Sequence, residues 1–184
     1  MAENLRAVSI GEMVVSDTPD EVLVAYGLGS CVAVCLYDPT ARVGGMLHAL
    51  LPNAPTPLAS RPRPPNLGGR KGSGGDGGRV DGNLTKFVDP GVSLLIDSIL
   101  QLGASRQRLI VHLCGGAQML SAPGFNNSLN VGERNVLAAE KSLRTSGFRI
   151  RSRATGGRTG RTVRLYIASG QVTVKSVGQG EQPL

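Results

Sequence analysis

Residues 26–52 read YGLGSCVAVCLYDPTARVGGMLHALLP, and this stretch decides the fold that we expect. Cys31 to Tyr37 is apolar almost throughout, as in a central strand that is buried on both faces. Asp38 to Thr40 has the composition of a turn, since proline presets φ and aspartate bonds its own backbone. Val43 to Leu51 is a second apolar run, which Pro52 ends. The pattern predicts two antiparallel strands joined by a short turn.

The open end of this hairpin carries one cysteine and one histidine. Cys31 follows a turn with glycines at 27 and 29, and its backbone N–H groups are expected to lower the thiol pKa and to hold an oxyanion. Antiparallel pairing brings His48 close to opposite Cys31, near the reach needed for proton transfer. We therefore take Cys31 as a candidate nucleophile and His48 as its partner, although each residue is also typical of a buried core position.

The other cysteines and the second histidine offer a competing pair. His112 and Cys114 lie close together in the apolar run LIVHLC, but we rank this pair lower because neighbouring strand residues do not readily point together. Cys35 and Cys114 are otherwise expected to be small buried hydrophobic groups. The candidates for holding an oxyanion or positioning a substrate are Gly29, Ser30, Gly115 and Gly116.

The N-terminal part of the chain predicts a second hairpin. Residues 1–11 are a polar lead-in. Glu12–Ser16 and Glu21–Ala25 are short apolar runs separated by a polar turn, so we expect them to pair with each other. Residues 53–83 are rich in proline and glycine and contain few apolar residues, which predicts a flexible insert.

The C-terminal part predicts two helices and several strands. Asp89 is the expected N-cap of a helix that ends at Gly103, and Asn130 with Glu133 forms a capping-box-like start of a helix that ends at Gly147. Strands are expected over 106–114, 148–154, 162–168 and 171–176, with residues 155–160 as a hairpin loop and 177–184 as a tail.

Strands in runs with two helices between them predict the α+β class. We expect a layered, mixed, largely antiparallel β-sheet with two main helices packed on it. The chain has 184 residues, which is long enough for one domain with a substantial core, so we expect residues 1–184 to form a single domain.

Composition excludes several functional classes. Three cysteines without a C-x-x-C pair argue against a disulfide framework or a zinc site, and no cofactor or metal is expected. No apolar run approaches the roughly 20 residues that span a bilayer, and no signal core is present, so a cytoplasmic protein without membrane insertion is expected. The net charge of +7 suggests an anionic partner. However, tryptophan is absent and no nucleic-acid-binding motif is present, so we do not expect nucleic acid as the partner.

Several motifs in order resemble one known family. GLGSCVAVCLYD followed by VGGMLHALLP is similar to the signature of the CheD family, the bacterial chemoreceptor glutamine deamidases. The later GGAQM, VGERN and TGGRTGR motifs resemble the same family in the same order. The resemblance runs from about Leu5 to Lys175, and it implies a layered fold similar to that of a deamidating bacterial toxin.

The resemblance also implies roles for individual residues. The family's nucleophilic cysteine corresponds to Cys31 and its histidine to His48. A family threonine that orients the histidine corresponds to Ala25, which has no hydrogen-bonding side chain. Tyr26, Ser30 or a backbone carbonyl is then expected to take this role.

The implied reaction is hydrolysis of glutamine side-chain amides in the cytoplasmic domains of methyl-accepting chemoreceptors. It would proceed through a thioester on the cysteine, without a cofactor. The alternative function is a non-catalytic chemotaxis adaptor that binds receptors or a CheC-type phosphatase.

Overall fold

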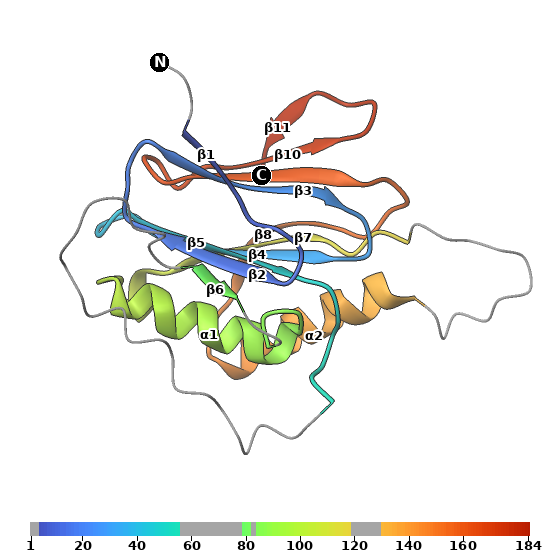
Figure 1. The fold of residues 1–184 in the computed structure, drawn as a ribbon, viewed down its shortest axis with the longest axis horizontal. Helices are drawn as coiled ribbons and strands as arrows, with labels where there is room; N and C mark the ends of the chain where they lie inside the picture. Colours follow the sequence, from blue (N-terminus) through green and yellow to red (C-terminus); the bar gives the residue numbers. More distant parts are fainter. Residues whose placement is uncertain (1–3, 56–78, 82–83, 119–129) are drawn as a thin grey trace, which may run out of the picture.

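The computed structural model describes residues 4–55, 79–81, 84–118 and 130–184, and these form three layers. Two β-sheets lie face to face, and both helices pack on the far side of one of them (Figure 1). We call the sheet between the other layers the central sheet and the remaining sheet the outer sheet. The helices are α1 (Val88–Gln101) and α2 (Val131–Thr145), and Arg106–Arg108 form a 3₁₀ turn.

The two sheets have mixed but mostly antiparallel strand orders. In the described residues the outer sheet has the order β1 (Asn4–Ala7), β3 (Glu21–Leu28), β9 (Arg161–Tyr166), β10 (Val172–Ser176), β11 (Glu181–Pro183). The central sheet has the order β6 (Arg79–Asp81), β2 (Glu12–Ser16), β5 (Val43–Ala49), β4 (Val32–Asp38), β7 (Ile110–Gly115), β8 (Ile150–Thr155). Only the β1–β3 and β7–β8 pairs are parallel among these strands. The predicted α+β class is confirmed, and the strands divide into two sheets rather than one.

Two of the predicted hairpins are wrong. β2 pairs with β5 and β6, whereas β3 pairs with β1 and β9, so the turn between β2 and β3 carries the chain from one sheet to the other. The loop between β8 and β9 makes a second crossing of the same kind. A turn motif reports that the chain reverses, but it does not report whether the two strands then share a sheet or face each other across a core. The β4–β5 hairpin is confirmed, as is the β9–β10 pair.

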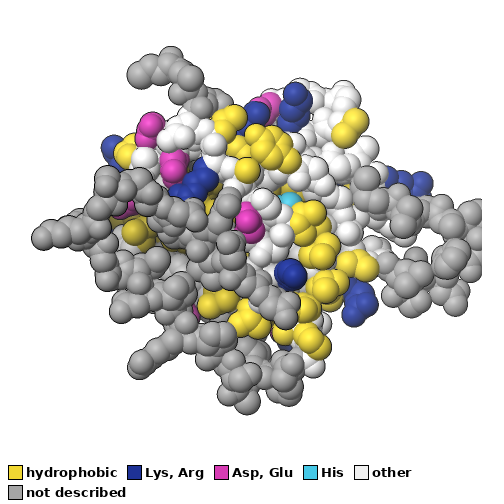
Figure 2. All heavy atoms as spheres, viewed as in Figure 1, with side chains coloured by type: hydrophobic (Ala, Val, Ile, Leu, Met, Phe, Trp, Pro, Cys, Tyr) yellow, Lys and Arg dark blue, Asp and Glu magenta, His cyan; other side chains and the backbone are white. Residues whose placement is uncertain are grey.

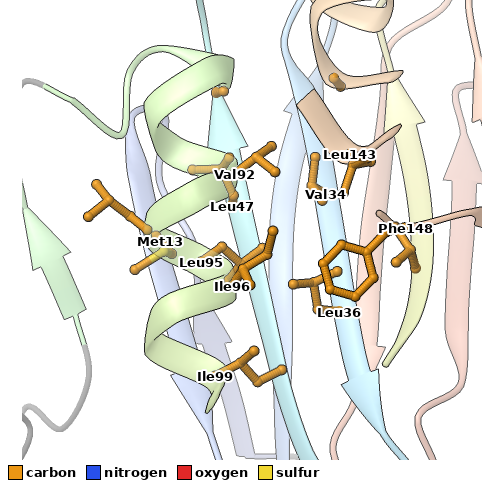
Figure 3. Close-up of a cluster of buried hydrophobic side chains, with 14 of the residues drawn as sticks. Met13, Val34, Leu36, Leu47, Val92, Leu95, Ile96, Ile99, Leu143 and Phe148 are labelled. Carbon is orange, nitrogen blue, oxygen red and sulfur yellow. The ribbon is translucent and has the colours of Figure 1, made fainter. Parts of the chain in front are cut away.

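The central sheet is buried on both faces, as expected for the apolar run that forms β4. Val34 and Leu36 point toward the helices, where they pack with Leu95 of α1 and Leu143 of α2 (Figure 3). The alternate residues of the same strands face the outer sheet. That second core contains Ala33, Cys35, Met46, Cys114, Leu23, Val163 and Leu165. Period-two alternation therefore gives each strand of the central sheet one face for each core.

The starts of the two helices differ in how well the sequence predicts them. α1 begins at Val88 with Phe87 as N-cap and no side-chain capping bond, so the predicted N-cap Asp89 is wrong. Asp89 lies in the first turn, and its Oδ1 accepts from the N–H of Ala54 at 3.0 Å. α2 is capped as predicted, since the Oδ1 of Asn130 accepts from the N–H of Glu133 at 3.1 Å.

Three segments that the sequence leaves without elements contribute edge strands. The polar lead-in contains β1, the tail over 177–184 contains β11, and β6 forms within the glycine-rich insert. Each pairs with an apolar strand that would otherwise have a free edge. Two further parts of the predicted insert lie outside the described residues, namely 56–78 and 82–83. In the described part of the chain, neither helix is long and apolar enough to cross a membrane.

Candidate active site

The register of the central sheet makes Cys31 and His48 diagonal neighbours. Val32 pairs with Ala49 and Ala33 pairs with His48, so His48 lies across from the residue two places after Cys31. The alternation of side chains places both on the face toward the outer sheet. Diagonal residues on neighbouring strands lie about 7–8 Å apart, within reach of long side chains. In the described residues no hydrogen bond joins the two side chains, because the Nε2 of His48 has no partner.

The His48 ring is held by the segment that follows β1. Its Nδ1 lies 3.0 Å from the carbonyl oxygen of Val8, and its own carbonyl accepts from the N–H of Gly11 at 2.8 Å. A carbonyl only accepts, so Nδ1 carries the proton and the buried Nε2 presents a lone pair. Burial lowers the pKa of His48, and the Val8 carbonyl and Glu12 offset this only in part. The ring is therefore a neutral base at neutral pH.

Cys31 is the only one of the three cysteines with any exposed surface. Its side chain and backbone together are 6% exposed, against 0% for Cys35 and Cys114. Burial raises the pKa of Cys31, and a hydrogen bond from its own backbone N–H lowers it by a smaller amount. The expected lowering of this pKa by the glycine turn is thus outweighed by burial. The resting group is a thiol rather than a thiolate.

The turn before Cys31 is fixed through its backbone carbonyls. The oxygen of Gly29 accepts from the N–H of Ala117 at 2.7 Å, and that of Cys31 accepts from the N–H of Gly116 at 2.7 Å. The oxygen of Ser30 accepts from the side chain of Asn135 at 2.9 Å. Three consecutive carbonyls therefore point into the protein.

These bonds bear on the expected role of the glycine turn at residues 115–117, which we call the second glycine turn. The N–H of Gly116 is bonded to the Cys31 carbonyl, so it holds the cysteine backbone instead of presenting a free donor to a substrate. Gly115 has φ +103°, and a Cβ there would lie 2.2 Å from the Cys31 oxygen. Only glycine fits so close to the backbone of Cys31.

Asn135 and Arg161 are site residues that the sequence analysis missed. Asn135 is fully buried on α2, and Arg161 is 8% exposed on β9. The Arg161 guanidinium donates to the carbonyls of Ala154, Gly156 and Gly115, and so holds the second glycine turn. Periodicity carries the missing signal. Arg161 lies two and four residues before buried residues of β9, and Asn135 lies four and eight residues before buried residues of α2.

The group that is hydrogen-bonded to the His48 ring is a backbone carbonyl. Ala25 is fully buried in the core between the sheets and offers no acceptor. Tyr26 is 52% exposed, and among the described residues neither it nor Ser30 makes a hydrogen bond to His48. Of the three groups that the sequence left open for the orienting role, only a backbone carbonyl, that of Val8, is hydrogen-bonded to His48 in the described residues.

In the competing pair the cysteine, Cys114, is fully buried, and His112 is 7% exposed. Cys35 and Cys114 are fully buried, as predicted. Burial raises the pKa of Cys114 to about 12, and burial and the charge of Arg151 lower the pKa of His112. A thiol that is so weakly acidic and out of contact with solvent is a poor nucleophile. In the described chain no three His, Cys, Asp or Glu side chains converge as metal ligands.

Three exposed apolar side chains lie close in the sequence to residues that contact Cys31, His48 or their backbone neighbours. Ile10 lies between Val8 and Gly11, Leu51 follows the strand that carries His48, and Leu137 is two residues from Asn135; all three are more than one third exposed. Figure 2 shows hydrophobic side chains gathered on one face of the molecule, next to a small area of histidine surface. An open hollow of about 250 Å³ adjoins the second glycine turn and is lined by Gly116, Asn130, Glu133, Val136, Leu137, Thr155 and Gly156.

Comparison with known proteins gives a consistent set of relatives. A family model described as CheD chemotactic sensory transduction matches residues 73–176. The chain is 40% identical over 180 residues to a probable chemoreceptor glutamine deamidase CheD of Symbiobacterium thermophilum, covering 98% of this chain and 97% of the relative. It is 36% identical over 177 residues to the chemoreceptor glutamine deamidase CheD of Thermotoga maritima, covering 96% and 95%. A Thermococcus kodakarensis protein, a probable chemoreceptor glutamine deamidase CheD, is 40% identical over 174 residues, covering 95% and 94%. With a family model matched over more than half of its length and relatives that align almost from end to end, this chain belongs to the CheD family.

Proposed function

We propose that this chain is a chemoreceptor glutamine deamidase, which hydrolyses glutamine side-chain amides of methyl-accepting chemoreceptors to glutamate and ammonia. The names of its relatives support the substrate and the reaction. The observation that carries the proposal is the state of His48: a buried ring with Nδ1 fixed by Val8 and a free Nε2, diagonal to the one cysteine with exposed surface. The proposed substrates are cytoplasmic domains, so we place the reaction in the cytoplasm.

The proposed reaction begins from a neutral thiol and a neutral imidazole. Nε2 of His48 takes the thiol proton as the sulfur of Cys31 attacks the amide carbon, and the oxygen becomes an oxyanion. The backbone N–H groups of Ser30 and Cys31 are the proposed donors to that oxyanion, because their carbonyl partners in the peptide groups point the other way.

The second half of the reaction reverses these transfers. The carbon–nitrogen bond breaks as His48 gives its proton to the leaving nitrogen, which departs as ammonia and leaves a thioester on Cys31. His48 then takes a proton from water, and the hydroxide attacks the thioester carbon. The carbon–sulfur bond breaks, the proton on His48 passes to the sulfur, and the new carboxyl group loses its own proton to water and is released as glutamate.

The apolar surroundings suit a protein substrate better than a small one. Ile10, Leu51 and Leu137 are exposed near the groups that hold the pair, and exposed apolar side chains of this size commonly mark contact surfaces. Glutamine in a receptor helix would be presented with neighbouring apolar residues that can pack here.

The direct test is incubation of the protein with chemoreceptor cytoplasmic domains, followed by mass spectrometry of amide-to-acid conversion at each glutamine. We expect conversion by the wild type and none by Cys31→Ala. Cys114→Ala is the matched control, since it removes a fully buried thiol from the same sheet and should leave conversion intact. Absence of conversion by the wild type, or equal conversion by Cys31→Ala, would reject the proposal.

A second candidate function is a non-catalytic adaptor that binds receptors or a CheC-type phosphatase. The burial of Cys31, which is only 6% exposed, and the raised pKa of its thiol favour the adaptor, because both weaken the case for an activated nucleophile. Full restoration of chemotaxis by Cys31→Ala in a deletion strain would support the adaptor. Failure of that variant, at wild-type protein levels, would support catalysis.

A further inference from the structure

Asn135 is a buried amide that contacts both sides of the candidate active site. Its Nδ2 donates to the carbonyl oxygen of Ser30 and to that of Leu50, each at 2.9 Å. Both partners are carbonyl oxygens, so the nitrogen and not the oxygen of the amide must face them. Ser30 directly precedes Cys31, and Leu50 follows His48 by two residues. One side chain from α2 therefore ties the cysteine turn to the end of the histidine strand.

The bond to Ser30 sets the orientation of the peptide group before Cys31. In a trans peptide the C=O and the following N–H point in opposite directions, and no described peptide is cis. With the Ser30 oxygen turned toward α2, the N–H of Cys31 points away from α2. This N–H is the backbone group that lowers the pKa of Cys31 against the larger, opposite effect of burial. Asn135 thus controls a donor at the reacting atom without touching that atom.

Of the three groups that bond the carbonyls of residues 29–31, only Asn135 acts through its side chain, so a substitution can remove it. The carbonyls of Gly29 and Cys31 are held by backbone N–H groups of the second glycine turn, whereas that of Ser30 is held by a side chain. The position also carries an energetic cost, because the Oδ1 of Asn135 is buried and has no hydrogen-bond partner among the residues that the structure describes. A buried acceptor left unpaired destabilises the fold, so packing alone does not account for an amide here.

We propose that Asn135 is a positioning residue for the deamidation. It aims the Cys31 N–H at the sulfur and at the developing oxyanion, and it sets the spacing between Cys31 and His48. The kinetic consequence rests on the proposed function above. The consequence for the thiol does not, because the N–H acts on the sulfur whether or not a substrate is bound.

The first experiment measures the rate of Cys31 alkylation by iodoacetamide against pH, mapped to the Cys31 peptide by mass spectrometry. We expect Asn135→Ala to move the midpoint to higher pH, because the thiolate loses a well-aligned donor. Leu143→Ala is the matched control, since it removes a fully buried side chain from the same face of α2 and touches no carbonyl of the turn. It should lower the thermal midpoint of unfolding and leave the alkylation midpoint where it is.

The second experiment measures kcat and KM on a chemoreceptor cytoplasmic domain. We expect kcat to fall about tenfold or more in Asn135→Ala, with KM within about twofold of the wild type, since the donor acts on the transition state. If Asn135→Ala does not fold, Asn135→Ser answers the same question, because its short hydroxyl can hold at most one of the two carbonyls.

The outcomes separate this inference from the proposed function. An unchanged alkylation midpoint in a folded Asn135 variant, or an equal shift in Leu143→Ala, overturns the positioning role. A wild-type protein that converts no glutamine rejects the proposed function, and the alkylation result then still decides the role of Asn135 at the sulfur.

Discussion

Cys31 and His48 rest as an uncharged pair because burial favours the neutral form of both side chains. Removing a group from water disfavours its charged form, which raises the pKa of a thiol and lowers that of an imidazole. The structure shows both directions, for Cys31 and for His48. In the proposed reaction the nucleophile is therefore formed during the attack, by proton transfer to Nε2, and is not stored as a thiolate–imidazolium pair.

This resting state predicts the pH dependence of the reaction. The Nε2 of His48 must be unprotonated to accept the thiol proton, and its pKa lies below the ordinary histidine value of about 6.5. We expect kcat/KM to stay level through neutral pH and to fall only on the acid side of the ordinary histidine range. Initial rates on a receptor domain, measured across that range, provide the test.

Alkylation of Cys31 in the absence of substrate checks the other half of the pair. Its midpoint should lie above that of a free cysteine, because burial raises the pKa of this thiol. A midpoint below that of free cysteine would show a preformed ion pair and contradict the neutral resting state. Cys35→Ala should leave the curve unchanged, since Cys35 has no exposed surface.

At the scale of elements, two glycines allow α2 to lie against the turn that holds Cys31. A Cβ on Gly132 would lie 2.6 Å from the backbone oxygen of Gly116, and a Cβ on Gly116 would lie 2.8 Å from the oxygen of Gly132. This approach places Asn135, one turn further along α2, within reach of Ser30. The glycine turn of the GGAQM motif and the start of the VGERN motif thus contact each other directly.

We expect Gly132→Ala to lower both stability and activity. The added methyl meets backbone, which cannot move aside as a side chain can, so α2 must shift away from the turn at a cost of about 1–3 kcal/mol in the free energy of unfolding. kcat should fall with it, because Asn135 moves with the helix. Urea unfolding and initial rates measure the two effects.

Gly91→Ala in α1 is the matched control for this prediction. Its Cβ would meet the far end of the Leu47 side chain at 2.9 Å, and that side chain can rearrange. Alanine also favours a helix over glycine by about 1 kcal/mol, which offsets the strain. Stability should change by less than about 1 kcal/mol and kcat should not change; a loss of kcat equal to that of Gly132→Ala would argue against the special role of the α2 contact.

At the scale of the whole molecule, Asp38 joins the end of β4 to the connection between α1 and β7. Its buried carboxylate accepts two bonds from Arg108, at 3.0 and 2.8 Å, and one from the N–H of Ser105 at 2.7 Å. Burial alone would raise the pKa of Asp38, but Arg108 and the backbone donors outweigh it and hold the pKa well below its usual range. The carboxylate of Asp38 therefore holds the connection between α1 and β7 against the end of β4.

The link predicts a loss of stability in acid. The pKa of Asp38 is lower in the folded state, so its stabilisation is complete above the unfolded value of about 3.9 and is lost as the pH falls below that value. Asp38→Asn should lower the free energy of unfolding by about 1.5–3 kcal/mol at neutral pH, because the bonds that the buried carboxylate accepts from Arg108 and Ser105 lose their charged acceptor. The variant's unfolding free energy should then depend less on pH below 4 than that of the wild type. Parallel slopes for the two proteins would show that other carboxylates carry the acid sensitivity.

The layering of the sheets is where the sequence was least informative. Alternation and apolar runs identified β2, β3, β8 and β9 as strands, because those patterns come from the local period of side chains. The turns between β2 and β3 and between β8 and β9 looked like hairpins, yet each crosses between sheets. A reversal of direction is local, whereas the choice of partner depends on strands that are distant in sequence, as for β3 and β9, which are more than a hundred residues apart.

The sequence by itself determined the class of the fold, the β4–β5 hairpin, the cap of α2 and the place of Cys31 and His48 at the open end of that hairpin. These follow from side-chain period, turn chemistry and pairing register, all of which act over short stretches of chain. Only the tertiary structure decided that the sheets are two, that the Val8 carbonyl orients His48, and that Asn135 holds the Ser30 carbonyl. The reason is physical. Every residue has a backbone carbonyl, so the residue type does not reveal which carbonyl accepts a hydrogen bond. Burial, which sets the charge of the pair, depends on how the layers pack.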